Sequence, residues 1–172
     1  APSDILGSLA HGKMLESVGI LDKKEWRILK RELLQLYELA RTGKLIIENH
    51  VEDIHSQVEL ILTEKVGEIA KKIHTGRSRN DQVLLDIRLY SRDQIRDIVS
   101  LVGSLFDTLL DLSEKYKKDL MPGYTHMQVA MPSSFGLWFA AYAESLLDDT
   151  IQLQGAYEII NKNPLGSAAG YG

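Results

Sequence analysis

Hydrophobic residues recur at three- and four-residue steps along most of the chain, the spacing that places them on one face of an α-helix. The first part of the chain is predicted to hold three short helices: one from Ser3 or Asp4 to Gly19, one from Asp22 to Gly43, and one from Glu52 or Asp53 to Gly67. The second of these opens with a D-x-x-E pair that resembles a capping box. Each pattern stops at a glycine, as helices commonly do.

The longest periodic pattern predicts a helix of about 37 residues from Gln82 to Lys118. At 1.5 Å per residue, such a helix would be on the order of 55 Å long. A rod of this length needs neighbouring helices along all of it, which favours a large bundle or an oligomer. The alternative is two shorter helices that break near Gly103, although a glycine left inside a helix costs only about 1 kcal/mol.

A proline-glycine pair then signals a turn, and a further helix is expected after it. This helix should run from about Pro132 to Asn161, because proline suits a first helical turn and Ser133 or Ser134 suits its polar start. No segment combines alternating polarity with turn boundaries, so no strand is expected. The sequence therefore predicts an all-α protein.

A polar loop, HTGRSRNDQV, directly precedes the longest predicted helix. Asn80 or Asp81 is expected to cap that helix by accepting from backbone N–H groups. Arg77 and Arg79 would stand just outside the helix start, where unpaired N–H groups already favour anions. A dicarboxylate ligand would suit such a place. Taken alone, the loop could equally be a solvated basic surface with an ordinary cap.

A second polar loop, holding Tyr124, Thr125, His126 and Gln128, also precedes a long helix. A single loop histidine is more often structural than catalytic, but here Thr125 and Gln128 can orient a ligand beside an imidazole that exchanges protons near neutrality. If the two long helices are antiparallel, these loops lie at opposite ends of the bundle. A site shared between subunits is then the expected way to combine Asn80 with His126.

Composition limits the classes of partner and compartment. With 20 basic and 24 acidic residues the formal net charge is -4, which gives no general reason to expect nucleic acid or an anionic membrane as partner. The absence of cysteine excludes disulfides and thiolate metal sites, and it fits a reducing cytoplasm. No apolar run is long enough to span a bilayer and no leader pattern is visible, so a cytoplasmic protein is expected.

A metal site is not expected from the sequence. His50, Glu52, Asp53 and His55 cluster near the start of the third helix, but they lack the H-E-x-x-H spacing or a comparable one. Asp53 is more simply a helix cap, and His55 a hydrogen-bonding partner for a neighbouring loop.

Several segments together are similar to argininosuccinate lyases, in the fumarase and aspartase superfamily. They are DILGSLAHGKML near the start, EDIHS at 52–56, HTGRSRNDQV at 74–83, GYTHMQVAMPSSFG at 123–136 and NPLGSAAGYG at 163–172. The resemblance covers essentially the whole chain, and SRND together with T-H-x-Q is much more specific than either motif alone. HTGRSRNDQV fits this branch better than lyases acting on adenylosuccinate, aspartate or malate.

The resemblance implies a homotetrameric, mainly helical enzyme with sites shared between subunits, which cleaves argininosuccinate reversibly into arginine and fumarate without metal or organic cofactor. By match to the family motifs, His126 is the catalytic residue, which could act as base, acid or relay. The substrate-binding residues are expected to be Ser78, Arg79, Asn80, Thr125 and Gln128, with Asp53 and His55 in support. Residues 1–75 would form an N-terminal helical segment and residues 76–172 the first part of the central bundle.

The chain departs from the family pattern at both ends. The mobile loop with the G-S-S-x-M-P-x-K-x-N signature, which carries the family's other proton-transfer residue, is absent, and so is the extreme N-terminal segment with a substrate-binding serine. A truncated chain without lyase activity of its own is therefore expected. Two alternatives to a lyase segment are a structural relative similar to the delta-crystallins and a helical oligomerisation module without activity.

Overall fold

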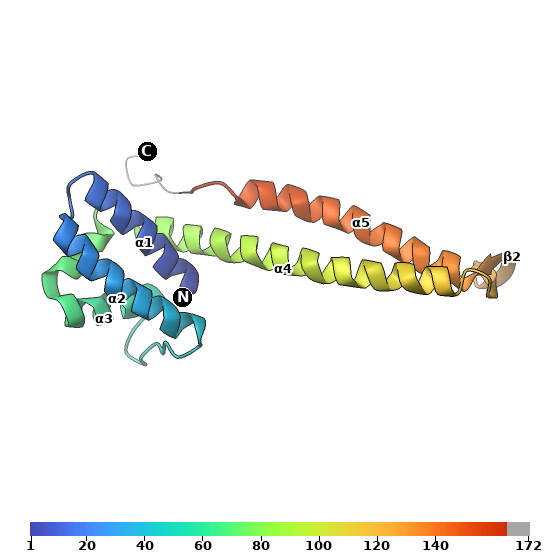
Figure 1. Cartoon of the computed structure of the whole chain (residues 1–172), viewed down its shortest axis with the longest axis horizontal. Helices are drawn as coiled ribbons and strands as arrows, with labels where there is room; N and C mark the ends of the chain where they lie inside the picture. The colour runs from blue at the N-terminus through green and yellow to red at the C-terminus, as the bar shows by residue number, and fades with distance from the viewer. Residues whose placement is uncertain (165–172) are drawn as a thin grey trace. The chain divides into compact units, whose positions relative to one another are not determined.

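The computed structural model describes residues 1–164, which form two compact units. The first unit comprises residues 1–90 with 163 and 164, and the second comprises Ser91–Lys162. The elements, coloured in chain order in Figure 1, are α1 Pro2–Ser17, α2 Lys23–Arg41, α3 Ile54–Val66, the 3₁₀ helix η1 Gly67–His74, α4 Arg79–Lys115, β1 Leu120–Thr125, β2 Gln128–Ser134 and α5 Phe135–Ile160. The predicted helical class is confirmed. Of the expected tail segment at 163–172, residues 165–172 lie outside the described part.

Local capping decides where two of the first three helices begin. Asp22 accepts from the backbone N–H of Lys24 and Glu25, and Glu25 accepts from the Asp22 N–H at 2.9 Å, so the expected capping box is present. Asp53 caps α3 by accepting from Ser56 N–H at 2.7 Å, which is also as expected. The cap expected at the start of the first helix is wrong. Asp4 lies inside α1 and is buried.

The core of the first unit lies among α1, α2, α3 and η1. Its buried members are Ile5, Leu15, Leu21, Trp26, Leu29, Leu33, Leu36, Val58, Leu62, Ala70 and Ile73. Two of these come from η1, a 3₁₀ helix that the sequence pattern did not predict. Gly12 allows α1 to approach α2 closely, since a Cβ at this position would lie 2.5 Å from the Trp26 ring. Burying one large aliphatic side chain in such a core contributes about 1.5 to 3 kcal/mol.

Helix α4 is one continuous helix of 37 residues, so the alternative break near Gly103 is wrong. It starts and ends three residues earlier than expected, at Arg79 and Lys115. Its first three turns belong to the first unit and the rest to the second, because the boundary between the units falls after Tyr90.

The prediction that the chain has no strand is wrong for residues 120–134. Strands β1 and β2 form an antiparallel hairpin whose register pairs Leu120 with Ser134 and Thr125 with Gln128. Pro132, expected in the first turn of the last helix, lies in β2 instead. Proline is tolerated there because a two-stranded ribbon consists of edge strands only. Helix α5 follows directly and is capped by Ser134, which accepts from Leu137 N–H at 3.1 Å, as expected for one of the two serines.

In the second unit α5 runs back antiparallel along α4 (Figure 1). The two helices approach closely near the hairpin, where a Cβ on Gly136 would lie 2.6 Å from the Ser113 carbonyl oxygen of α4. Ser113 Oγ donates to the Gly136 carbonyl at 2.8 Å, and Gly136 N–H donates to the Tyr116 carbonyl at 3.2 Å. Farther along, many large apolar side chains of both helices stay exposed, including Leu105 and Ile151. Among residues 1–164, no helix is both long and apolar enough to cross a membrane.

Candidate functional site

The first predicted polar loop turns at Gly76 and enters α4 through a capping box. Gly76 has a φ of 70°, a conformation that glycine adopts without steric cost. Asp81 N–H donates to Ser78 Oγ at 3.2 Å, and Ser78 N–H donates to Asp81 Oδ2 at 3.1 Å. The cap expected of Asn80 or Asp81 is therefore wrong, because Ser78 caps the helix and Asp81 completes the box from inside it. This box explains why α4 begins earlier than its apolar pattern indicates.

Arg79 and Asn80 are exposed at this helix start. Arg79 Nη1 lies 3.6 Å from Asp53 Oδ1 at the start of α3. Burial acts to raise the pKa of Asp53, but the hydrogen bonds from Ser56 and the nearby Arg79 charge hold this pKa below its ordinary value. Asp53 therefore keeps a negative charge that orients the Arg79 guanidinium, and the helix start presents a cation and an amide to solvent.

Arg77 does not stand outside the helix start, as the sequence analysis expected. It is half-buried, and its Nη2 donates to Ser8 Oγ of α1 at 3.2 Å. The charges that face it from the interior are the carboxylates of Asp4 and Asp86, with a smaller contribution from Asp81 in the first turn of α4. Arg77 therefore balances buried acids and is no candidate for binding a solvent-borne anion.

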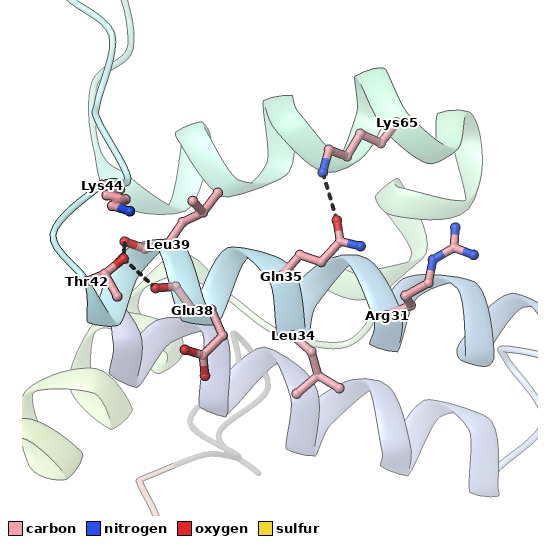
Figure 2. A pocket seen from close by; sticks show the side chains of 8 residues that line it. All are labelled: Arg31, Leu34, Gln35, Glu38, Leu39, Thr42, Lys44 and Lys65. Atoms are coloured by element: carbon pink, nitrogen blue, oxygen red, sulfur yellow. Dashed lines mark hydrogen bonds between the residues drawn. The ribbon is translucent and has the colours of Figure 1, made fainter.

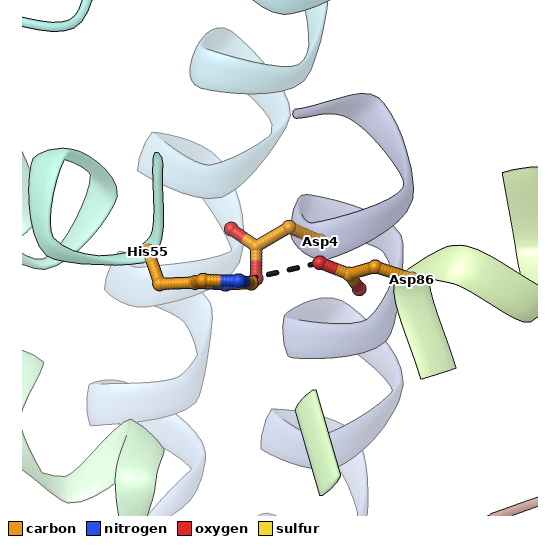
Figure 3. A group of neighbouring side chains, drawn as sticks. All are labelled: Asp4, His55 and Asp86. Carbon is orange, nitrogen blue, oxygen red and sulfur yellow. Dashed lines mark hydrogen bonds and ion pairs between the residues drawn. The ribbon is translucent and has the colours of Figure 1, made fainter. Parts of the chain in front are cut away.

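A polar cluster lies behind the loop, built from the buried Asp4, His55 and Gln82 and the partly buried Asp86 (Figure 3 shows three of these side chains converging). His55 Nδ1 donates to Asp4 Oδ1 at 2.8 Å and lies 3.8 Å from Asp86 Oδ2. Gln82 Nε2 donates to the same Asp4 oxygen at 2.5 Å. Burial, reinforced by the Asp4 carboxylate and opposed by His55 and Arg77, raises the pKa of Asp86 to about 7.

Asp4, His55 and Asp86 are also the described residues whose donor atoms could surround a metal ion, since these atoms lie within 4.8 Å of one another. Two observations favour a hydrogen-bonded cluster. Asp4 Oδ1 already accepts from both His55 and Gln82, and the Arg77 guanidinium supplies positive charge to both carboxylates. Within residues 1–164, the group that the sequence analysis considered around His50 and Glu52 is not brought together as a ligand set.

The second polar loop is the turn of the hairpin. Thr125 pairs with Gln128, and between them His126 and Met127 have φ values of 49° and 62°. Positive φ at both central residues is the geometry of a type I′ turn, which usually selects asparagine and glycine. A left-handed conformation costs a side-chain-bearing residue roughly 1 to 2 kcal/mol. The turn therefore holds the exposed His126 side chain at the tip of the hairpin, although the backbone conformation of His126 is disfavoured for residues other than glycine.

The predicted site residues thus fall into two groups. Asp53, His55, Ser78, Arg79 and Asn80 belong to the first unit, where the starts of α3 and α4 bring them together. The second group is Thr125, His126 and Gln128, which belong to the second unit.

Sequence reasoning missed the buried partners of the first group. Asp4 and Ser8 are spaced by four residues on α1, and Gln82 and Asp86 are spaced by four on α4. Such a spacing puts both members of a pair on one face of a helix. Polar residues recurring at helical spacing beside an apolar face were the signal that could have indicated a buried cluster.

One hollow of about 700 Å³ lies elsewhere in the first unit, between α2, α3 and the start of the loop that follows α2 (Figure 2). It is lined by Arg31, Leu34, Gln35, Glu38, Leu39, Thr42, Lys44 and Lys65. Most of its charged side chains pair with neighbours: Lys65 and Arg31 with Glu32, and Glu38 with Arg41. It contains none of the predicted site residues.

Comparison with known proteins decides the family. Residues 3–172 match a family model described as lyase. The chain belongs to this lyase family. An argininosuccinate lyase from Parabacteroides distasonis is 61% identical to it over the whole chain, which spans 39% of that protein's length. The resemblance that the sequence motifs indicated is confirmed.

Solved structures of lyases share its fold. An EDDS lyase crystallised in complex with formate is 29% identical, with a TM-score of 0.82 over 99% of this chain and 33% of that one. A fumarate lyase:delta crystallin from Brucella melitensis superposes with a TM-score of 0.80 over 98% of this chain and 42% of that one. At 15% identity, the latter likeness concerns the fold alone. The expected fumarase and aspartase type of helical fold is thus confirmed.

Proposed function

We propose that this chain is a segment of an argininosuccinate lyase, which cleaves argininosuccinate reversibly into arginine and fumarate in the cytoplasm as part of arginine biosynthesis. The observation that carries the proposal is the 61% identity to a protein of that name over all 172 residues, both polar loops included. The exposed Arg79 and Asn80 at a helix start support it, because such a place favours the carboxylates of a dicarboxylate substrate.

The proposed reaction breaks a C–H and a C–N bond and forms a carbon–carbon double bond. A base removes the proton next to a carboxylate, charge spreads into that carboxylate, and an acid protonates the departing guanidino nitrogen. We assign His126 to proton transfer, and Asn80 and Thr125 to substrate binding, with Ser78, Arg79 and Gln128 beside them. Preorganised donors around the developing charge would supply much of the stabilisation. Asp53 and His55 hold the first group in place.

The assembly is part of the proposal. The two groups of site residues lie in different units, and a homotetramer could combine them from different subunits. The exposed apolar side chains along α4 and α5 support such an assembly, since large unpartnered apolar surfaces mark interfaces. Residues 1–75 would be the N-terminal helical segment, and residues 76–172 the start of the central bundle. No metal or organic cofactor takes part in the proposed reaction.

The test uses the full-length lyase of which we propose this chain to be a segment, called the full-length parent below. Its turnover is followed through the ultraviolet absorbance of fumarate. His126→Asn should lower kcat by about 10²- to 10⁴-fold, the usual contribution of general acid–base catalysis. Asparagine suits this position because it adopts positive φ more readily than most residues, so the turn should persist. Asn80→Ala and Thr125→Ala should raise KM as well.

His50→Asn is the matched control, since His50 is an exposed histidine of the first unit whose nearest ionic partner is Glu48 at 3.6 Å. It should turn over at the parent rate. An assembled parent without turnover would instead support the structural relative or the oligomerisation module. Parent-like turnover by His126→Asn would move the proton-transfer role to another residue.

A further inference from the structure

Three helix starts meet around one buried carboxylate in the first unit. Asp4 comes from the start of α1, His55 from the start of α3, and Gln82 from the first turn of α4. Asp4 is 1% exposed, and its Oδ1 atom accepts from both of the other side chains. We propose that Asp4 is a positioning residue, which fixes the start of α4 against the start of α3 and thereby holds Arg79 and Asn80 in place for substrate. The proposal rests on the proposed lyase function.

Few residues separate the contacts of Asp4 from the exposed Arg79 and Asn80, both on α3 and on α4. On α3, His55 is two residues beyond Asp53, which lies 3.6 Å from Arg79 Nη1. On α4, Gln82 is two residues beyond Asn80 and on the same helical turn. A single carboxylate oxygen therefore sets the distance between the start of α3, which carries Asp53, and the start of α4, which carries Arg79.

A second contact ties the loop to the same helix. Arg77, immediately before the capping box, donates to Ser8, one turn after Asp4 on α1. The polar side of α1 thus contacts α3, α4 and the loop between η1 and α4. Because these groups are shielded from water, each bond is electrostatically stronger than it would be at the surface, and a lost acceptor leaves a buried donor without a partner.

The proposed effect of Asp4 on the reaction rate comes from the positions of Arg79 and Asn80 rather than from the stability of the fold. Asp4 is too deeply buried to touch substrate, so its contribution can only pass through the residues that it holds. Misplacing a binding group by about 1 Å can cost on the order of 10²-fold in rate. A substitution that loosens the Asp4 contacts should therefore reduce kcat/KM by about 10- to 100-fold, even when the protein remains folded.

The experiment compares Asp4→Asn with two controls. Asparagine has nearly the same shape and keeps an oxygen that can accept, but it removes the negative charge, so the bonds from His55 and Gln82 to that oxygen lose their charge assistance. Asp107→Asn removes an exposed carboxyl of α4 in the second unit and controls for charge. Leu29→Ala truncates a fully buried core side chain and controls for loss of stability.

Amide hydrogen exchange of the 172-residue chain gives the first readout. Asp4→Asn should speed exchange by at least about tenfold at residues 53–57 and 78–82 while leaving the middle of α2 at the parent rate. Leu29→Ala should instead speed exchange throughout the first unit. Parent-like exchange at both helix starts in Asp4→Asn would overturn the proposal, whatever the activity.

Kinetics of the full-length parent gives the second readout. Asp4→Asn should raise KM and lower kcat per folded site, whereas Leu29→Ala and Asp107→Asn should change neither. His55→Asn places an amide donor near the position of Nδ1 and should retain more activity than His55→Leu. Unchanged kinetics of Asp4→Asn in an active parent would overturn the positioning role alone. An inactive parent would overturn the proposed function and the positioning role with it.

Elemental analysis of the purified chain separates a hydrogen-bonded cluster from a coordination site. We expect no stoichiometric metal at Asp4, His55 and Asp86. A bound zinc or cobalt ion that is lost in Asp4→Asn would make Asp4 a metal ligand and overturn the proposal.

Discussion

Replacing Asp86 by asparagine should make the first unit more stable at neutral and alkaline pH. In the folded chain the pKa of Asp86 is raised from its ordinary 3.8 to about 7, first by burial and then by the neighbouring Asp4 carboxylate. Between about pH 4 and pH 7 the folded chain therefore keeps a proton that the unfolded chain has lost. Stability falls as pH rises through this window, because the folded state binds more protons than the unfolded state.

The full shift corresponds to about 4 kcal/mol, since each pKa unit is worth about 1.4 kcal/mol. The Asp86 side chain retains 17% exposure, so solvent screening reduces the expected penalty to about 2 kcal/mol above pH 7. Asp86→Asn imitates the protonated carboxyl and carries no penalty. Parent and variant should be equally stable near pH 4, and the variant should be about 2 kcal/mol more stable at pH 8.

The assay is urea unfolding at a series of pH values, followed by tryptophan fluorescence. Trp26 is buried in the first unit and Trp138 lies in the second, so a Trp138→Phe background restricts the signal to the first unit. His55, Arg77 and the Ala1 amino group also face Asp86, but they are present in both proteins and largely cancel in the difference. Parallel stability curves for parent and Asp86→Asn between pH 5 and pH 8 would refute the reasoning.

Three further outcomes are expected. Gly136→Ala should destabilise the second unit by about 1 to 3 kcal/mol in thermal unfolding, because its Cβ would meet backbone atoms of Ser113 and Lys117. Gly155→Ala, with open space around it, should be neutral or slightly stabilising. The 172-residue chain should associate through the apolar faces of α4 and α5, and a concentration-independent monomer in analytical ultracentrifugation would contradict this. The 172-residue chain alone should show no lyase turnover, because it spans 39% of the length of a related argininosuccinate lyase. Fumarate formation that begins when full-length His126→Asn is added would support sites assembled from several subunits. Robust turnover by the chain alone would refute the expectation.

Features set by neighbouring residues could be predicted from the sequence. The capping box of α2 and the Asp53 cap of α3 depend on contacts three residues apart, and both are present. The continuity of α4 follows from an apolar pattern that a single glycine does not interrupt. Ser78 was missed as a cap because the following Asn80 and Asp81 compete for that role in the sequence, and only the backbone geometry distinguishes them.

The hairpin could not be predicted from the pattern of polar and apolar residues in the sequence. Both of its strands are largely exposed, so no face alternates between apolar and polar residues. Its turn holds His126 and Met127 where a type I′ turn usually has asparagine and glycine, so the local signal is absent too. A register shift between Pro122 and Tyr124 interrupts the strand pairing further.

The buried cluster was missed for a different reason. Asp4, His55 and Asp86 are far apart in the sequence, and their contact depends on how α1, α3 and α4 pack. Arg77 was misplaced for the same reason, because the acids that draw it inward come from distant segments. Charge near a helix start indicates where an anion could bind, but it does not tell a surface arginine from one that neutralises the interior.

The prolines of the hairpin bear on how an exposed two-stranded ribbon avoids aggregation. An exposed two-stranded ribbon with apolar side chains such as Val129 and Met131 offers open edges to which further strands could add. Pro122 and Pro132 lie directly opposite each other in the register, so each strand lacks a backbone donor at the same level of the ribbon. A fibre growing by strand addition would be interrupted at this level on either edge. The paired prolines therefore allow the hairpin to expose apolar side chains while resisting edge-to-edge stacking.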